Sequence, residues 1–341
     1  MKFSAYMHEW LYGNEGYYTK ERTIGKEGDF YTAVSTSMFF GGAIAKRLLS
    51  TIESGFLSSS CHVVEIGAHK GYLLADMIQF IYTLKPALLS SLKFVIVEPF
   101  EANQLMQKTY FEEAFGTAIT LKHVKSLDEL RCEEAFFVAN EIFDAFSCEL
   151  IKEDQMLFVD KESLFFDTMD EKMKAKADEY AIKKGELCLE YESFAEAMHH
   201  CCNRFEFVTF DYGDKEERGD FSLRVYANHQ VYPFFTLTSL VEEKLREKND
   251  FNAFFAKSDI TYDVNFSHLF HAFEKNGIKV HVYSTQMKAL VEFGLTELLE
   301  LFAKNVSAKQ YETEMNKIKI LIDPSFMGER FKMACFRKGE V

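Results

Sequence analysis

The sequence predicts an α/β fold built on a mostly parallel sheet, and two neighbouring apolar runs are the clearest evidence for it. The first run, VVEIG, begins at Val63 and ends in a turn that carries Gly67 and Gly71. A helical stretch then continues to about Pro86, and the second run, FVIVE, occupies Phe94–Glu98. Strand, helix and strand in this order form the crossover that joins two parallel strands of one sheet.

The other strands follow from short apolar runs that lie between turn signals. Helical patterns separate the first of these runs, as parallel crossovers require. The C-terminal run is expected to be an antiparallel last strand. The expected strands are Cys61–Ile66, Phe94–Glu98, Ile119–His123, Ala135–Ala139, Phe205–Phe210 and Phe331–Arg337, with Lys279–Tyr283 as the partner of the last.

Two stretches are longer than a crossover needs. The stretch from Glu149 to about Glu190 begins with alternating, strand-like segments and continues into a charged helical part, in which 170–184 has the pattern of a solvated helix face. The stretch from Gly213 to about Asn276 holds FSLRVYANHQVY and a Phe-rich helical region. The expected organisation is an N-terminal segment at 1–60 and an α/β domain at 61–341, with insertions at about 149–203 and 214–276.

Length and composition agree with one α/β body that carries insertions. The chain has 341 residues, of which 48% are hydrophobic and 35 are phenylalanine, enough for a sizeable core. The formal net charge is −14, which argues against nucleic-acid binding because such proteins need a basic surface.

The sequence also favours a cytoplasmic setting without a membrane span. No run reaches eighteen uninterrupted apolar residues, and the N-terminal segment MKFSAYMHEWLYG lacks the apolar region of a signal peptide. The seven cysteines are odd in number and lack paired spacing, so reduced thiols are expected. In the cluster 199–202 (HHCC), adjacent side chains point in different directions, so we expect the end of a helix there and no metal site.

The turn after the first strand and the acid after the second indicate a nucleoside-containing cofactor. Ligands of open parallel sheets bind outside the carboxyl ends of the strands. Gly67 and Gly71 let the backbone approach a ligand at a helix N-terminus, and Glu98 can accept hydrogen bonds from ribose hydroxyls. The spacing matches neither the dinucleotide fingerprint nor the phosphate loop. A turn with two glycines in any α/β protein is the alternative.

The same turn resembles the first motif of class I S-adenosylmethionine-dependent methyltransferases, acid-x-Gly-x-Gly-x-Gly. Glu65, Gly67 and Gly71 occupy three of its positions, and His69 replaces the middle glycine. This resemblance implies a Rossmann-like, mostly parallel seven-stranded sheet with an antiparallel C-terminal strand. Insertions at the carboxyl edge of that sheet would form a lid over the cofactor, and the N-terminal segment would pack over the same site.

Over nearly the whole chain, the sequence resembles the MidA-like methyltransferases, a family that includes a mitochondrial complex I assembly factor with arginine methyltransferase activity. Each matching segment is short, but all of them follow the family's order. The segments are Gly16–Tyr18, Gly28–Thr32, Phe40-Gly41, the turn at Glu65–Gly71, Glu98, Ser126-Leu127, Ala139–Ala145, Asp211–Gly213, Asp259–Thr261, Ser284–Gln286 and Pro324–Lys332.

The resemblance implies S-adenosyl-L-methionine as cofactor and a protein substrate, with a complex I subunit as one candidate and a homodimer left open. It places the cofactor against a set of residues that follow the strand ends and the N-terminal GDF segment. These residues are Gly28, Asp29, Thr32, Glu65, Gly67, Gly71, Glu98, Ser126, Leu127 and Asn140.

The sequence departs from the family pattern in three places. The usual Gly-x-Gly-Arg-Gly has His69 and Lys70 at its third and fourth positions. Thr-Ser-Pro-Glu after GDF is here the segment 32–35 (TAVS), without the proline and the carboxylate. Thr-Ala-His-Val-Asp-Phe is here 261–266 (TYDVNF), without the histidine.

Methyl transfer to arginine needs carboxylates, because the guanidinium is charged and must be held so that one nitrogen faces the methyl group. Glu141 and Asp144, just past the fourth strand, are the candidate catalytic residues. As an alternative, these acids cap the next helix. Two other functions stay open: an assembly chaperone that has the fold but methylates nothing, and a methyltransferase of small molecules.

Overall fold

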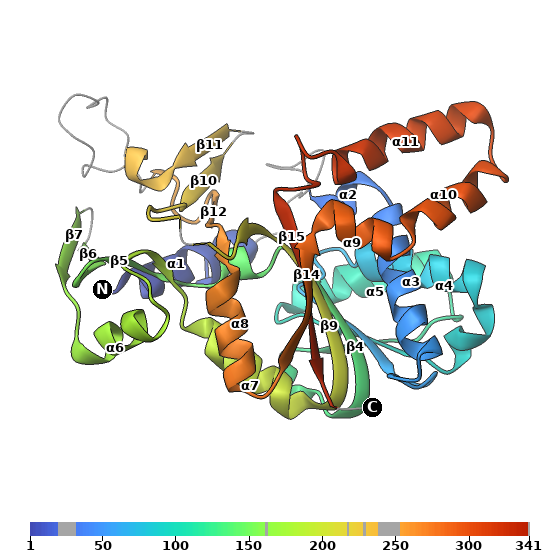
Figure 1. Cartoon of the computed structure of the whole chain (residues 1–341), viewed down its shortest axis with the longest axis horizontal. Coiled ribbons are helices and arrows are strands. Elements are labelled where there is room, and N and C mark those ends of the chain that lie inside the picture. The colour runs from blue at the N-terminus through green and yellow to red at the C-terminus, as the bar shows by residue number, and fades with distance from the viewer. Residues whose placement is uncertain (20–31, 161–162, 217, 228–229, 238–252, 340–341) are drawn as a thin grey trace. The chain divides into compact units, whose positions relative to one another are not determined.

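The computed structural model in Figure 1 describes residues 1–19, 32–160, 163–216, 218–227, 230–237 and 253–339. The chain divides into two compact units. We call one the sheet unit, which comprises Tyr31–Ile142, Ala195–Tyr212 and Phe273–Val341, and the other the insertion unit, which comprises Met1–Phe30, Phe143–Phe194 and Gly213–Ala272.

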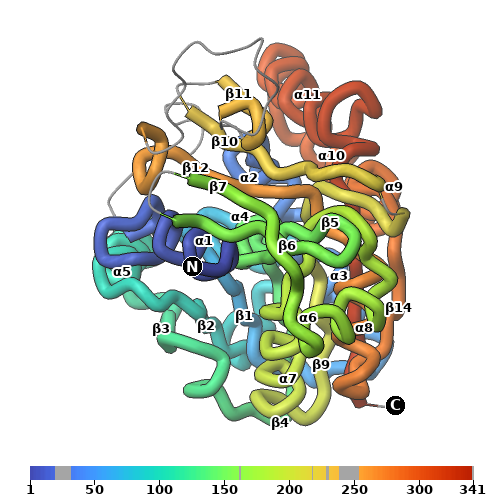
Figure 2. The backbone as a smooth tube through the Cα atoms, turned by 90° about the vertical axis from the view of Figure 1, so that its left-hand side faces the viewer, coloured from blue at the N-terminus to red at the C-terminus, as the bar shows by residue number. Residues whose placement is uncertain are grey.

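The central sheet has the strand order β3-β2-β1-β4-β9-β15-β14, and Figure 2 shows β3, β2 and β1 in sequence. Strands β3, β2, β1, β4 and β9 are parallel, while β15 is antiparallel to both of its neighbours, which confirms the predicted fold. The short strand β13 (Val264–Asn265) pairs with the last two residues of β9 and gives the described sheet an eighth strand. The main strands are β1 His62–Ile66, β2 Lys93–Val97, β3 Leu121–Val124, β4 Cys132–Asn140, β9 Cys202–Asp214, β14 Lys279–Thr285 and β15 Phe331–Lys338.

The strand register brings four carboxyl ends to one edge. Ile66 of β1 lies opposite Val97 of β2 and Ala139 of β4, and Val97 lies opposite Val124 of β3. The next residue of each strand is therefore at the same level of the sheet, where parallel α/β proteins bind their ligands.

Helices cover both faces of the sheet, which explains why its strands are apolar on both sides. Phe207 and Phe210 point to opposite faces of β9. Phe210 packs edge-on against Phe40 of α3, whereas Phe207 stacks on Phe273 at the end of α8. Helices α3 and α4 lie side by side (Figure 1). The helices of the sheet unit are α2 Ala33–Thr36, α3 Phe39–Glu53, α4 Tyr72–Leu84, α5 Glu101–Phe115, α9 Gln286–Glu292, α10 Leu295–Ala303 and α11 Ala308–Ile322, with 3-10 turns η2 Pro86–Ser90 and η3 Leu127–Glu129.

Two helices connect the units along the chain. Helix α7 (Glu190–Cys201) ends at Cys201, and Cys202 begins β9, which confirms the predicted helix end in the segment 199–202. Among the described residues, no group of three or more His, Cys, Asp or Glu side chains is arranged to hold a metal ion. Helix α8 is Phe266–Lys275.

The insertion unit contains two small antiparallel sheets. In the first, of order β7-β6-β5-β8, the strands are β5 Glu149–Lys152, β6 Gln155–Asp160, β7 Ser163–Thr168 and β8 Lys184–Leu187. In the second, of order β11-β10-β12, they are β10 Arg224–Ala227, β11 Gln230–Pro233 and β12 Asp259–Thr261. The remaining elements of the unit are α1 Phe3–Tyr12, α6 Glu171–Glu179 and the 3-10 turns η1 Tyr17–Thr19, η4 Phe143–Ala145 and η5 Phe234–Leu237.

The charged helix expected over 170–184 is shorter in the structure. Asp170 caps α6 by accepting from the backbone N–H of Met173, and the helix ends at Glu179. Ala181 then adopts a positive φ of 56°, which no α-helix continues through. Lys184 therefore begins β8 and pairs with Lys152 of β5.

The residues expected as one N-terminal segment, 1–60, are divided between the units: 1–30 belong to the insertion unit and 31–60 to the sheet unit. That this segment and the insertions cover the cofactor stays a prediction. Within the described part of the chain, no helix is both long and apolar enough to cross a membrane.

Candidate active site

The turn between β1 and α4 requires glycine at two positions. Gly67 and Gly71 have φ of 72° and 80°, in the left-handed region where side chains are strained. A Cβ at Gly67 would lie 2.8 Å from the Ile142 side chain, and one at Gly71 would lie 3.0 Å from Phe111. The turn is thus a closely packed cradle of backbone, as a ligand-binding turn requires.

His69 replaces the family's middle glycine and still adopts the glycine-like conformation. Its φ is 46°, so the departure costs on the order of 1 kcal/mol but leaves the turn intact. The His69 carbonyl oxygen accepts a hydrogen bond of 2.7 Å from the side-chain amide of Gln107 in α5. A buried side chain therefore fixes the backbone at the position where the sequence departs from the pattern.

Glu65 stabilises the first turn of helix α4, which follows the glycine turn. Its carboxylate is 4% exposed and accepts a hydrogen bond of 3.1 Å from the backbone N–H of Leu74, in the first turn of α4. The residue at the start of this helix, Gly71, has no side chain to serve as a cap, so Glu65 satisfies an N–H that would otherwise lack a partner. Burial raises the pKa of Glu65 to about 8.

Glu98 follows β2 and is the predicted ribose acceptor. It is 3% exposed, and its two oxygens accept from the Phe100 backbone N–H at 3.0 Å and from the Gln107 amide at 3.3 Å. Each carboxylate oxygen has two acceptor sites, so both can also accept from a ribose hydroxyl. Burial raises the pKa of Glu98, and these donors oppose the rise.

Gln107 is the residue that the sequence reasoning missed. Its side chain is fully buried, donates through Nε2 to both His69 and Glu98, and accepts through Oε1 from the His123 ring at 3.0 Å. Because Nε2 serves two acceptors, Oε1 receives the hydrogen bond and His123 carries a proton on Nε2. The available signal was a polar residue among the core positions of the helix after the second strand.

The ends of β3 and β4 complete this edge of the sheet. Ser126 is half-buried at the start of η3, and Leu127 is buried. Asn140 donates through Nδ2 to Oε1 of Glu141 at 2.7 Å, while its own buried Oδ1 has no partner among the described residues. Glu141 has a φ of 54° and donates its backbone N–H to Phe210 at 2.8 Å. The strand end is therefore fixed, and it includes a buried acceptor suited to a ligand donor.

The predicted contact with the cofactor stays a prediction for three other residues. Gly28 and Asp29 lie outside the described residues. Thr32 begins α2 in a capping box with Ser35, each side chain bonding the other's backbone N–H. This bonding explains the local structure of Thr32 and leaves its predicted contact with the cofactor untested.

Asp144 belongs to the insertion unit, where the structure brings three of the family-like segments together. It is 5% exposed, and its backbone carbonyl accepts from the Tyr262 N–H at 3.1 Å. The Tyr18 hydroxyl lies 2.9 Å and 3.0 Å from the two carboxylate oxygens of Asp259 and donates to them. The Tyr18 ring stacks on Tyr12. The pKa of Tyr18 is raised well above its usual value. Burial is the largest cause, and the negative charges of Asp259 and Asp144 add to it. Two buried acids and two half-buried tyrosines therefore lie near one another in this unit.

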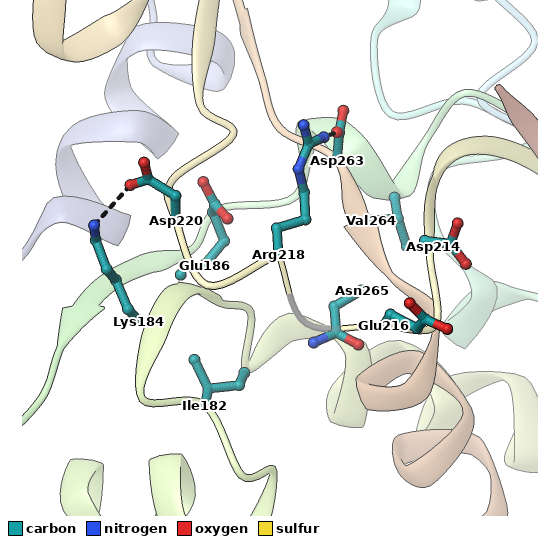
Figure 3. Close-up of a pocket in the computed structure, with 11 residues that line it drawn as sticks. Ile182, Lys184, Glu186, Asp214, Glu216, Arg218, Asp220, Asp263, Val264 and Asn265 are labelled. Carbon is teal, nitrogen blue, oxygen red and sulfur yellow. Dashed lines mark ion pairs between the residues drawn. The ribbon is translucent and has the colours of Figure 1, made fainter.

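A separate open pocket of roughly 400 Å³ lies within the insertion unit (Figure 3). Acidic side chains outnumber basic ones in it, and both of its basic residues are in ion pairs: Lys184 binds Asp220 at 2.8 Å, and Arg218 binds Asp263. Glu186 accepts from backbone N–H groups of the segment that carries these residues. These ion pairs and hydrogen bonds therefore stabilise the local structure around the pocket.

The strand order, the antiparallel strand β15, the two glycines of the turn and the buried acid after β2 are typical of a Rossmann-like methyltransferase fold. Residues 43–284 match a family described as "Putative S-adenosyl-L-methionine-dependent methyltransferase", and the chain belongs to this family.

Two relatives and one solved structure extend the comparison. The chain is 25% identical over 98% of its length to the "Protein arginine methyltransferase NDUFAF7 homolog, mitochondrial" of Drosophila melanogaster, covering 81% of that protein. It is 23% identical over 93% of its length to the Danio rerio protein arginine methyltransferase NDUFAF7, covering 78% of it. A COG1565 superfamily member from Burkholderia thailandensis, bound to S-adenosyl-homocysteine, has a similar fold with a TM-score of 0.77 and 21% identity, over 99% of this chain and 88% of that one.

The described residues fit S-adenosylmethionine, the cofactor of this family. Glu98 would accept from the ribose hydroxyls, the backbone at Gly67 and Gly71 would approach the methionine part, and Oδ1 of Asn140 would accept from its ammonium. When bound, the cofactor supplies a methyl group on a positively charged sulfur. The chain is an S-adenosylmethionine-dependent methyltransferase, and its own residues must orient the acceptor and exclude water.

Proposed function

We propose that the protein methylates an arginine of a protein partner, and that this partner is a subunit or an assembly intermediate of the respiratory NADH dehydrogenase, complex I. The names of the relatives support arginine as the acceptor. The observation that carries the proposal is the carboxylate of Glu141 at the end of β4, the edge of the sheet where the cofactor turn also lies.

Glu141 has the chemistry to position a guanidinium. Asn140 holds one of its carboxylate oxygens at 2.7 Å, and the positive φ of Glu141 fixes the backbone that carries it. A carboxylate fixed in this way can accept two N–H groups of arginine side by side, which orients the plane of the guanidinium. The remaining nitrogen would then face the methyl group in line with the bond that breaks.

Asp144 is the second proposed carboxylate. Its buried position near Asp259 and the two tyrosines gives it rigid surroundings, and its burial strengthens any charge-assisted hydrogen bond that it forms. In this proposal, Asp144 contributes to orientation of the substrate and not to binding of the cofactor.

The test compares Asp144→Asn and Glu141→Gln with Glu153→Gln, a control at an exposed glutamate that shares the positive φ of Glu141. Partners captured from the native organism are incubated with each protein and labelled cofactor, and methylarginine is measured by mass spectrometry. We expect Asp144→Asn to abolish the label and Glu141→Gln to reduce it by at least 100-fold, while calorimetry finds nearly unchanged cofactor affinity for Asp144→Asn.

An assembly chaperone that binds the cofactor without transferring its methyl group would give the opposite pattern. Asp144→Asn would then complement a deletion strain fully, and no partner would carry methylarginine. That result would overturn the proposed activity. A cytoplasmic location remains our expectation from the sequence, and fractionation of the native organism would test it.

A further inference from the structure

Two thiols face each other where β4 and β9 begin. Cys132 is the first residue of β4, Cys202 is the first of β9, and the two are register partners in these parallel strands. The Cys132 thiol donates to the Cys201 carbonyl at 3.7 Å, the Cys202 thiol donates to the Arg204 carbonyl at 3.2 Å, and neither cysteine forms a disulfide. Neighbouring strands lie about 4.8 Å apart, within the range of roughly 4.4–6.8 Å that a disulfide spans between Cα atoms.

The next two residues of each strand show that side chains at the same level meet across this strand pair. Asn203 donates to Glu133 at 2.8 Å, and Arg204 donates to Glu134 at 3.3 Å. The strands are therefore held together on both sides of the pleat beside the cysteines. The strand register therefore places the two cysteines within the span of a disulfide.

The two cysteines also differ in access. Cys132 is half-buried, whereas Cys202 is 1% exposed. The neighbouring Cys202 side chain lowers the pKa of Cys132 and the charge of Lys93 contributes to the decrease, while burial opposes it. Cys132 is thus the thiol that a small oxidant can reach, and Cys202 is its buried partner on the neighbouring strand.

We propose that Cys132 and Cys202 are a reversible redox pair, which closes a disulfide when the protein meets a peroxide. The Cys132 thiol attacks one oxygen of hydrogen peroxide, which breaks the O–O bond and gives a sulfenic acid and one water. The Cys202 thiol then attacks the sulfur of this sulfenic acid, forms the S–S bond and releases a second water. In total, two thiols are oxidised by two electrons and one peroxide is reduced to two waters.

The pair lies at the end of the sheet opposite the cofactor site. Along β4, Asn140 is eight positions after Cys132, which at about 3.3 Å per residue is roughly 26 Å. The disulfide would connect two strands through a loop of 70 residues (202 minus 132), which constrains the unfolded chain more than the folded one. Oxidation should therefore raise the melting temperature and leave cofactor affinity unchanged.

The experiment treats the full chain with hydrogen peroxide, then denatures it, alkylates it with iodoacetamide and measures the intact mass. We expect seven alkylated cysteines before treatment, five after it, and seven again after reduction with dithiothreitol. Peptide mapping should show Cys132 linked to Cys202. The variant Cys201→Ser is the control, because the thiol of Cys201 is buried and donates to the Met198 carbonyl in its own helix. It should still form the bond.

The variant Cys202→Ser should stop at the first step, with a sulfenic acid on Cys132 that dimedone traps, and its melting temperature in the reduced state shows whether it folds. The proposal is overturned if the treated protein keeps seven alkylatable cysteines, if Cys132 is oxidised to sulfinic acid without a cross-link, or if Cys201 is the linked partner.

Discussion

Gln107 connects the cofactor turn with the ribose acid, and replacing it by methionine tests whether this connection matters. Methionine has nearly the same length and volume but offers no amide. The change removes the donor to the His69 carbonyl at 2.7 Å, the donor to the Glu98 carboxylate at 3.3 Å and the acceptor of His123 at 3.0 Å. The apolar contacts of the helix are retained.

The size of the effect follows from burial. Gln107 is fully buried, so its replacement removes a buried donor to the His69 carbonyl, at a cost of about 1–3 kcal/mol in the free energy of unfolding. Glu98 loses a donor to its charged form, which raises its pKa further and lets its carboxylate rotate. We expect the affinity for S-adenosylmethionine to fall about 10- to 100-fold, equal to roughly 1.4–2.7 kcal/mol.

Calorimetry with S-adenosylmethionine measures the affinity, and a thermal melt of the same sample shows that the variant is folded. The matched control is Gln104→Met in the same helix. Gln104 donates at 2.6 Å to the backbone carbonyl of Glu98 and not to its carboxylate, so this variant should lose stability but keep its affinity within about threefold. Equal affinities of the wild type and the Gln107 variant would refute the reasoning.

Three further changes test other parts of the structure. Glu206→Gln should lower the free energy of unfolding by about 3–5 kcal/mol in urea, because Glu206 is fully buried between Arg47 at 2.6 Å and Arg337 at 2.7 Å. Burial lowers the pKa of His268 from 6.5 to about 3, so the unfolded chain binds the extra proton and stability falls as the pH drops below 6.5. At pH 5 this loss is about 2 kcal/mol, and His268→Phe should remove it when unfolding at pH 7 and pH 5 is compared. The raised pKa of Glu98 predicts that cofactor affinity falls on acidification at a higher pH than for an ordinary glutamate, and Glu98→Gln should bind more weakly with a flatter pH profile.

The sheet could be predicted because its signal is local. An apolar run that ends in a turn marks a buried parallel strand, and the C-terminal strand predicted as Phe331–Arg337 is Phe331–Lys338 in the structure. The third strand was placed slightly early, at 119–123 instead of 121–124, because it alternates at the sheet edge and has no continuous apolar run.

Strand β8 could not be predicted, because its residues favour other structures. Lys184–Leu187 reads KGEL, which has a glycine and two charged residues and follows a lysine-rich helical pattern. Pairing with β5 makes it a strand, and Gly185 opposite Ile151 has a positive φ of 148°, which residues with a side chain rarely adopt. Such pairing is a tertiary effect that no local pattern contains.

The positions of the candidate site residues at the strand ends could be predicted from the sequence, but the contacts between their side chains could not. Gly67, Gly71 and Glu98 stand at strand ends that the sequence identifies, so their place at one edge follows from topology. Gln107 lies on the inner face of a helix, and its role depends on the register between that helix and two strands. The hydrogen bond between Tyr18 and Asp259 joins segments 241 residues apart, a distance over which sequence order carries no information about contact.

His69 shows how a departure from a family pattern should be weighed. A missing glycine is often taken as loss of the site, yet the backbone at this position keeps its positive φ of 46° and its carbonyl is held by Gln107. The strain is on the order of 1 kcal/mol, which is small beside the affinity that a bound cofactor supplies. The cofactor also has no pyrophosphate, so its turn does not need the closest backbone approach that dinucleotides require. The cradle can therefore tolerate a side chain at this one position, whereas a Cβ at Gly67 would collide with Ile142 at 2.8 Å.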